Sequence, residues 1–145
     1  MEREIGETQR LMGELAHPLK FFRPNGKGRL GPHLLSRDAL AFLLEQRFTM
    51  VTWNNVPGDW LEPKLAWVDN ALAALAKLPW SLLVLHDEHI AQMMPTLADF
   101  YARAMEMGAE IVQDFPASCV PIRQGQIVGP IDDLVTPALA DAANG

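Results

Sequence analysis

The chain has 145 residues, 49% of them hydrophobic, which suffices for one compact domain with a core and excludes a disordered chain. Its formal net charge of −6 argues against nucleic acid or an anionic membrane as the main partner. The single cysteine excludes an internal disulfide, and the charged N-terminus has no signal-peptide pattern, so we expect a cytoplasmic protein.

The first half of the chain alternates helical and extended patterns. Apolar residues at rough helical spacing predict a helix over 4–15, and the short apolar run 19–22 predicts a strand. The glycines and prolines of 23–32 indicate a loop. Ser36 is a good N-cap for a second helix, and β-branched and aromatic residues over 47–53 predict a second strand.

The same alternation continues in the second half. An apolar stripe predicts a helix over 65–77, and the continuous apolar run 80–86 is typical of a strand covered on both faces. Pro95 suits the start and Gly108 the end of a further helix. Residues 109–113 are predicted as the fourth strand.

The order of these elements predicts an α/β fold. Strands that alternate with helices through short connections indicate right-handed crossovers and a parallel sheet, here of about four strands. A complete barrel of this type needs about eight strands and roughly 250 residues. We therefore expect a partial (β/α) barrel over 1–116, followed over 117–145 by an extended arm with a weakly formed helix near 131–140.

Polar loops follow three of the predicted strands, in the segments "FFRPNGKG", "TWNNVPGDW" and "LVLHDEH". The carboxyl ends of parallel strands meet at one face of a sheet, which is where such folds bind ligands. The three loops are therefore predicted to form a site. The alternative is that these strands simply end in solvent.

Three short motifs occur in order in these loops: Arg23-Pro24 with Gly26, Asp59-Trp60, and Leu85-His86-Asp87. Together they resemble the third, fourth and fifth motifs of the polysaccharide deacetylase family, the NodB-homology group of carbohydrate esterases. The resemblance covers about residues 4–116 and concerns the C-terminal half of that family. It implies a deformed (β/α) barrel and a hydrolase that removes acetyl groups from amino sugars or related amides.

The family holds a divalent metal, usually zinc, with one aspartate and two histidines, and a second aspartate is its general base. Those residues come from two N-terminal motifs that have no counterpart here. We therefore expect no metal site and no cofactor in this chain, with zinc expected only in the full-length family. The chain would be a truncation, have a misassigned start, or be completed by a partner chain.

The resemblance implies a role for each site residue. His86 would give a proton to the leaving nitrogen, Asp59 would hydrogen-bond and orient His86, and Arg23 would pair with the missing base. The alternatives are a strand-end histidine bonded to a backbone carbonyl, an aspartate that caps a loop, and a surface arginine at a turn. Other expectations concern the family's oxyanion position, taken here by Asn25, and tryptophans that would stack on a sugar (Trp53, Trp60) or pack in the core (Trp67, Trp80).

Two functions follow as hypotheses. The first is the C-terminal part of a deacetylase acting on an acetylated sugar or small amide, with the isolated chain binding zinc weakly and nearly inactive. The second is a non-catalytic α/β module that binds a carbohydrate or protein partner through the same loops. Half a barrel leaves a sheet edge open, so we expect either a homodimer or a missing N-terminal half to cover it.

Overall fold

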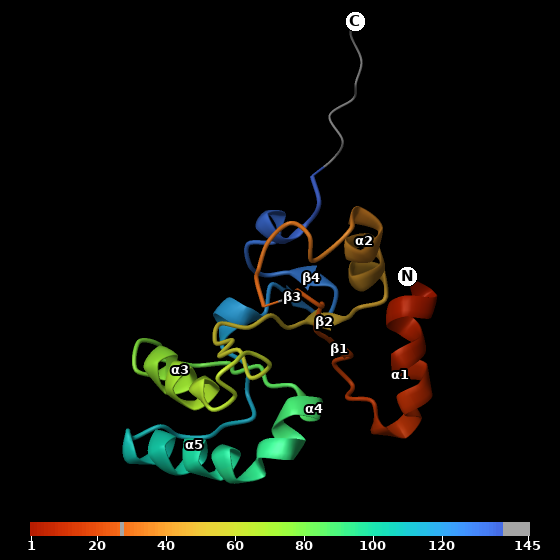
Figure 1. Ribbon diagram of the computed structural model, residues 1–145. Coiled ribbons are helices and arrows are strands. Elements are labelled where there is room, and N and C mark those ends of the chain that lie inside the picture. Colours follow the sequence, from red (N-terminus) through yellow and green to blue (C-terminus); the bar gives the residue numbers. More distant parts are fainter. Residues whose placement is uncertain (27, 138–145) are drawn as a thin grey trace, which may run out of the picture. The chain divides into compact units, whose positions relative to one another are not determined.

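The computed structural model describes residues 1–26 and 28–137, and the chain forms two compact units (Figure 1). Unit 1 comprises Met1–Thr52 and the described part of Val120–Gly145, and unit 2 comprises Trp53–Cys119. The architecture is mixed α/β, with a small four-stranded sheet in unit 1 and most of the long helices in unit 2. The predicted α/β class is therefore confirmed.

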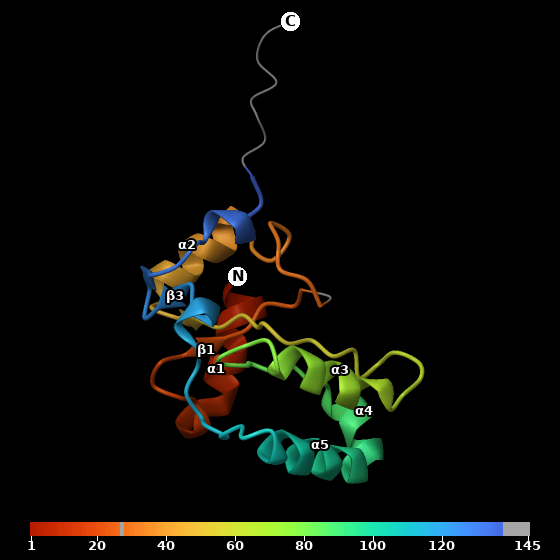
Figure 2. The same ribbon diagram turned by 90° about the vertical axis from the view of Figure 1, so that its left-hand side faces the viewer.

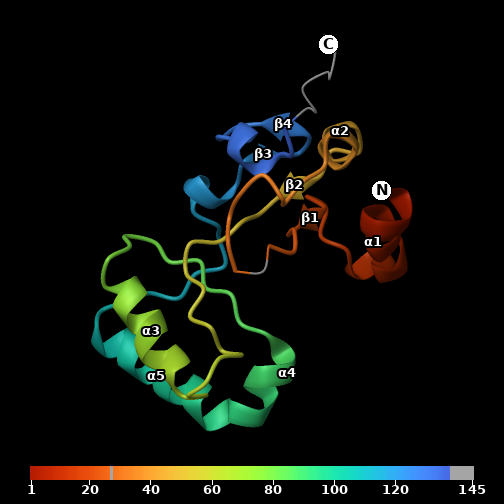
Figure 3. The same cartoon turned by 45° about the horizontal axis from the view of Figure 1, so that its top comes forward.

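The sheet of unit 1 has the order β1-β2-β3-β4, with β1 at Phe21–Phe22, β2 at Thr49–Met50, β3 at Ile122–Arg123 and β4 at Gln126–Ile127 (Figure 3). The first two strands pair in parallel, whereas β3 is antiparallel to both β2 and β4. The prediction that all the strands are parallel is therefore wrong.

The hairpin between β3 and β4 has a local cause in the sequence. Its two connecting residues, Gln124 and Gly125, have φ of 48° and 78°, which is the pattern of a type I′ turn. Glycine is required at 125 because a Cβ there would meet the carbonyl oxygen of Leu44. Met50 of β2 and Ile122 of β3 are register partners and are both fully buried, so this pairing lies at the centre of unit 1.

Helices of unit 1 follow the sequence pattern closely. The predicted N-terminal helix is a continuous helical run, formed by a π-helix at Glu2–Gly6, α1 at Glu7–Met12 and a 3₁₀ turn at Gly13–Leu15. The second helix, α2, spans Arg37–Glu45, and the Ser36 hydroxyl accepts from the Ala39 N–H at 3.1 Å as an N-cap. The cap predicted at Ser36 is therefore confirmed.

Residues 120–137 of the segment predicted as an extended arm belong to unit 1. Their backbone bonds to the start of α2, since the Leu35 N–H donates to the Leu134 oxygen at 3.1 Å and the Thr136 N–H donates to the Leu35 oxygen at 2.9 Å. Only a 3₁₀ turn at Asp132–Leu134 forms where a helix was expected over 131–140, of which 138–140 lie outside the described residues.

Unit 2 is built on two packed helices, α3 at Ala66–Leu75 and α5 at Met94–Glu106 (Figures 1 and 2). The short α4 at Asp87–Ile90 and 3₁₀ turns at Ala91–Met93 and Ala117–Cys119 complete its regular structure. Pro95 lies in the first turn of α5, and Gly108 follows the helix with φ of 84°, as expected of these residues. The buried core of this unit consists of Trp67, Val68, Ala71, Leu72, Ile90, Phe100 and Ala104.

Two predicted strands are absent or reduced. Residues 109–113, all of them described, form no strand, and Ile111 and Val112 are exposed. The run 80–86 is extended but contributes only one isolated bridge, a parallel one between Leu83 and Asn55.

Trp67 is buried as predicted, whereas Trp80 is exposed, so its prediction as a core residue is wrong. Within the described residues, no helix combines the length and apolar character that crossing a membrane requires.

Candidate functional site

The candidate site forms where two extended segments of unit 2 run in parallel. The Asn55 N–H donates to the Leu82 oxygen at 3.2 Å, and the Val84 N–H donates to the Asn55 oxygen at 3.0 Å. Because the segments share a direction, the loop that follows Asn55 and the loop that follows Val84 emerge at the same end. This pairing brings Asp59 and His86 together, although they lie 27 residues apart in the chain.

Two asparagine side chains reinforce this pairing. Asn54 Oδ1 accepts from the Leu82 N–H at 2.6 Å, and its Nδ2 donates to the Trp80 oxygen at 2.8 Å. The buried Asn55 donates from Nδ2 to the Ala71 oxygen at 3.1 Å and to Ser81 Oγ at 3.0 Å. The sequence pattern predicts only that these asparagines lie in a loop. Their one sequence signal is the adjacent amide pair that directly follows a strand pattern.

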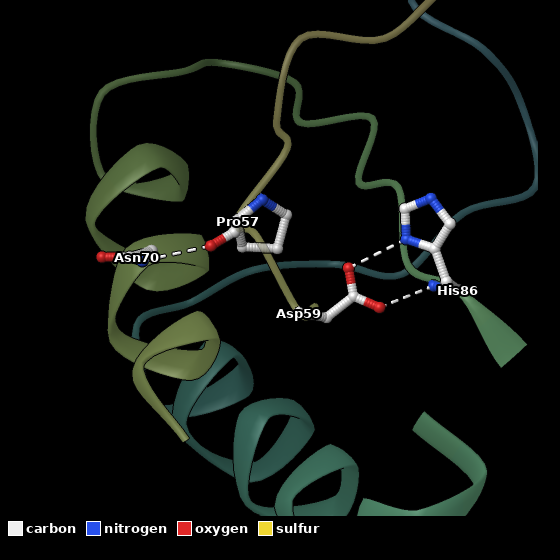
Figure 4. Close-up of polar contacts among 4 residues, drawn as sticks. All are labelled: Pro57, Asp59, Asn70 and His86. Atoms are coloured by element: carbon white, nitrogen blue, oxygen red, sulfur yellow. Dashed lines mark hydrogen bonds and ion pairs between the residues drawn. The ribbon is translucent and has the colours of Figure 1, made fainter. Parts of the chain in front are cut away.

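Asp59 contacts His86 at two points (Figure 4). The His86 backbone N–H donates to Oδ2 at 2.8 Å, and Nδ1 of the imidazole lies 3.0 Å from Oδ1. The Asp59 side chain is fully buried, whereas that of His86 is 45% exposed. An ionised Asp59 can only accept, so Nδ1 then carries the proton and Nε2 is left available to a ligand.

The turn that contains Asp59 depends on Gly58, the residue before it. Gly58 has φ of 79°, and the Leu61 N–H donates to its carbonyl oxygen at 2.9 Å. A Cβ at this position would also lie 2.8 Å from Leu61 Cδ1, so a larger residue would be strained and crowded. The loop therefore reverses directly at Gly58 and points Asp59 inward.

His86 is held from the other side by the start of α4. Its carbonyl oxygen accepts from the N–H groups of His89 and Ile90, both at 3.0 Å. Ile90 is buried in the core of unit 2, which anchors this turn of helix. The histidine backbone is thus fixed at both its N–H and its carbonyl oxygen.

Aromatic side chains surround the exposed part of the imidazole. The Trp60 ring meets the His86 ring edge to face, with centroids 5.0 Å apart, and the His89 ring lies 6.2 Å away. Trp60 is 40% exposed, so it has surface to offer to a ligand, whereas Trp53 is only 5% exposed. Of the two tryptophans predicted to stack on a sugar, Trp60 is therefore the accessible one.

The two remaining predicted residues belong to unit 1. Arg23 and Asn25 are both exposed and lie in the loop after β1. The neighbouring Gly26 is buried, and its carbonyl oxygen lies 3.3 Å from His33 Nε2. Since Asp59 and His86 belong to unit 2, the convergence of Arg23 with that pair stays a prediction.

In the described part of the chain, no group of three His, Cys, Asp or Glu side chains is placed to hold a metal ion. Asp87 is exposed in the first turn of α4, and Cys119 is buried. The chemistry that the described geometry offers is proton transfer at His86 Nε2, with Asp59 holding the ring and Trp60 beside it.

Comparison of the chain with protein-family models, with curated proteins and with solved structures found no match.

Proposed function

We propose that this chain supplies the proton-donating part of a hydrolytic site for N-acetyl or related amide bonds, in the manner of polysaccharide deacetylases. The observation that carries this proposal is the two-point contact of the buried Asp59 with His86. An orienting carboxylate on one ring nitrogen leaves the other in a fixed position, as an acid catalyst requires. A histidine placed only to end a strand needs no such partner.

The proposed step at His86 is simple. When an amide is hydrolysed, the C–N bond breaks and the leaving nitrogen must gain a proton. An imidazolium held by Asp59 would release that proton from Nε2 and become neutral, with its remaining proton on Nδ1. Activation of the attacking water would fall to residues outside this chain, in an N-terminal segment or a partner subunit.

We also propose that the chain folds as a partial (β/α) barrel. Support comes from two parallel pairings that follow the chain order, β1 with β2 in unit 1 and Asn55 with Leu83 in unit 2. In each case the paired segments are joined through a helix, α2 or α3. The antiparallel β3 departs from a simple barrel, because it pairs with β2 at Met50.

A second candidate is a non-catalytic module that binds acetylated sugars, and the observation that favours it is Trp60. An exposed indole beside a polar pair is suited to stacking on the apolar face of a sugar. The two candidates share the same ligand and differ in whether a bond is broken. Hydrolysis is therefore the measurement that separates them.

The experiment has two stages. N-acetylglucosamine oligomers are first titrated into the chain, and the amide signal of His86 and the indole signal of Trp60 are followed by NMR. The genomic sequence upstream of Met1 is then read for an aspartate pair and an H-x3-H motif. The chain joined to that upstream segment, called the joined chain, is assayed with zinc for acetate release. We expect the joined chain to be active and His86→Ala to lower its rate by about 10²–10⁴-fold.

A matched variant, His89→Ala, replaces the neighbouring histidine and should change the rate less than about 3-fold, because the hydrogen bonds to the Asp59 oxygens come from His86. Equal rates for the His86→Ala variant and the unmodified joined chain would refute the proposed acid role. Binding of the sugar at Trp60 without acetate release in any form would favour the non-catalytic module.

A further inference from the structure

Asn70, on α3, holds the loop that carries Asp59. Its Nδ2 donates to the Pro57 carbonyl oxygen at 3.1 Å, two residues before Asp59 (Figure 4). The next residue of the helix, Ala71, accepts from Asn55 Nδ2 at 3.1 Å. One turn of α3 therefore fixes the loop at residue 55 and again at residue 57.

The second of these bonds acts on the peptide that controls the direction of Asp59. Pro57 is buried and has no N–H, so its carbonyl is its one backbone hydrogen-bonding group. The position of that oxygen sets the plane of the peptide between Pro57 and Gly58. Glycine is the residue with the widest choice of backbone angles, so without a fixed peptide plane Gly58 could turn Asp59 in several directions.

The two members of the pair are thus held by different helices. His86 is fixed by α4, because the N–H groups of His89 and Ile90 in this helix donate to its carbonyl oxygen. Asp59 is carried by a loop that Asn70 fastens to α3. The contacts of 2.8 and 3.0 Å between Asp59 and His86 and the Asn70 bond to Pro57 thus meet in one short loop.

We propose that Asn70 is a positioning residue of this site. By holding the Pro57 carbonyl, it places the Asp59 carboxylate so that the neutral His86 ring keeps its proton on Nδ1. The Nε2 atom of that neutral ring is then unprotonated. Its importance for catalysis rests on the proposed acid role of His86, whereas its effect on the ring can be measured without any substrate.

The ring tautomer of His86 is the readout, and long-range ¹H–¹⁵N NMR spectra of the whole chain report which ring nitrogen carries the proton. In the unmodified chain, at a pH where the ring is neutral, we expect the proton on Nδ1. In Asn70→Ala we expect the share of the opposite tautomer to rise about five-fold, the size of effect that one hydrogen bond supports. Asn70→Asp keeps the shape but removes the amide donor, so it should give the same change.

Asp69→Ala is the matched control. Asp69 is the adjacent exposed residue of α3, and it also loses one side-chain hydrogen bond, to Arg103 at 2.7 Å, but it does not touch the loop. Because Asn70 is exposed like Asp69, the Asn70→Ala and Asp69→Ala variants should unfold at nearly the same temperature. A tautomer change in both Asn70 variants, and none in Asp69→Ala, is the expected result.

Two results would overturn the positioning role. One is an unchanged tautomer in Asn70→Ala, and the other is an equal change in Asp69→Ala. Neither depends on hydrolysis. If the Asn70 variants shift the tautomer while no form of the protein releases acetate, the positioning role stands and the proposed enzymatic function falls.

Discussion

Replacing Asp59 by alanine perturbs the site at its most buried polar group. The carboxylate is fully buried, and its two oxygens both contact His86, at 2.8 and 3.0 Å. A hydrogen bond to a charged group contributes about 1.5–3 kcal/mol, and a buried donor left without an acceptor costs about 1–3 kcal/mol. Water can replace the acceptor at the half-exposed ring but less readily at the backbone N–H. We therefore expect the free energy of unfolding to fall by about 3 kcal/mol.

Asp59→Asn separates the shape of the side chain from its chemistry. The amide oxygen can still accept from the His86 N–H, and the amide nitrogen can donate to a bare Nδ1. The loss of stability should then be only about 1 kcal/mol, but the proton of the neutral ring moves to Nε2. NMR of the imidazole nitrogens would show this change directly.

Urea unfolding followed by tryptophan fluorescence is the appropriate assay, because all four tryptophans lie in unit 2 together with the site. Asp87→Asn is the matched control. It changes an exposed aspartate next to His86, so it should cost less than about 1 kcal/mol. The reasoning about a buried two-point contact would be refuted if Asp59→Ala were no more destabilising than this control.

Three further predictions concern the fold. Gly125→Ala should destabilise unit 1 by more than about 2 kcal/mol in thermal unfolding, because its φ is positive and a Cβ would meet Leu44, whereas Gly108→Ala has open space and should cost about 1 kcal/mol; equal losses would contradict this. Phe100→Ala should cost about 3–5 kcal/mol in urea unfolding, since its ring packs 5.6 Å from that of Trp67, and a loss below 1 kcal/mol would show that this core contact is unimportant. An open barrel edge should make the chain self-associate at micromolar concentration, and sedimentation equilibrium that finds only a 16.1 kDa monomer would argue against it.

Local signals in the sequence were sufficient for α2 and α5. Ser36 caps α2, and the pair Pro95 and Gly108 brackets α5, because capping and chain termination depend on the residue itself and its nearest neighbours. The sequence also indicated that Asp59 and His86 belong to one site, through their places after two extended segments that run in parallel. Both inferences needed only short stretches of chain and the direction of the strands.

Tertiary structure decided what sequence patterns leave open. The apolar run 109–113 is consistent with a strand, but a strand forms only where another backbone is available to pair, and this run has none in the described fold. The pairing of Met50 with Ile122, 72 residues later, places an antiparallel strand beside β2, where the sequence pattern predicted only parallel strands. Asn70 likewise gains its role only when α3 packs beside Pro57, because a side-chain amide has no function until the fold supplies its acceptor.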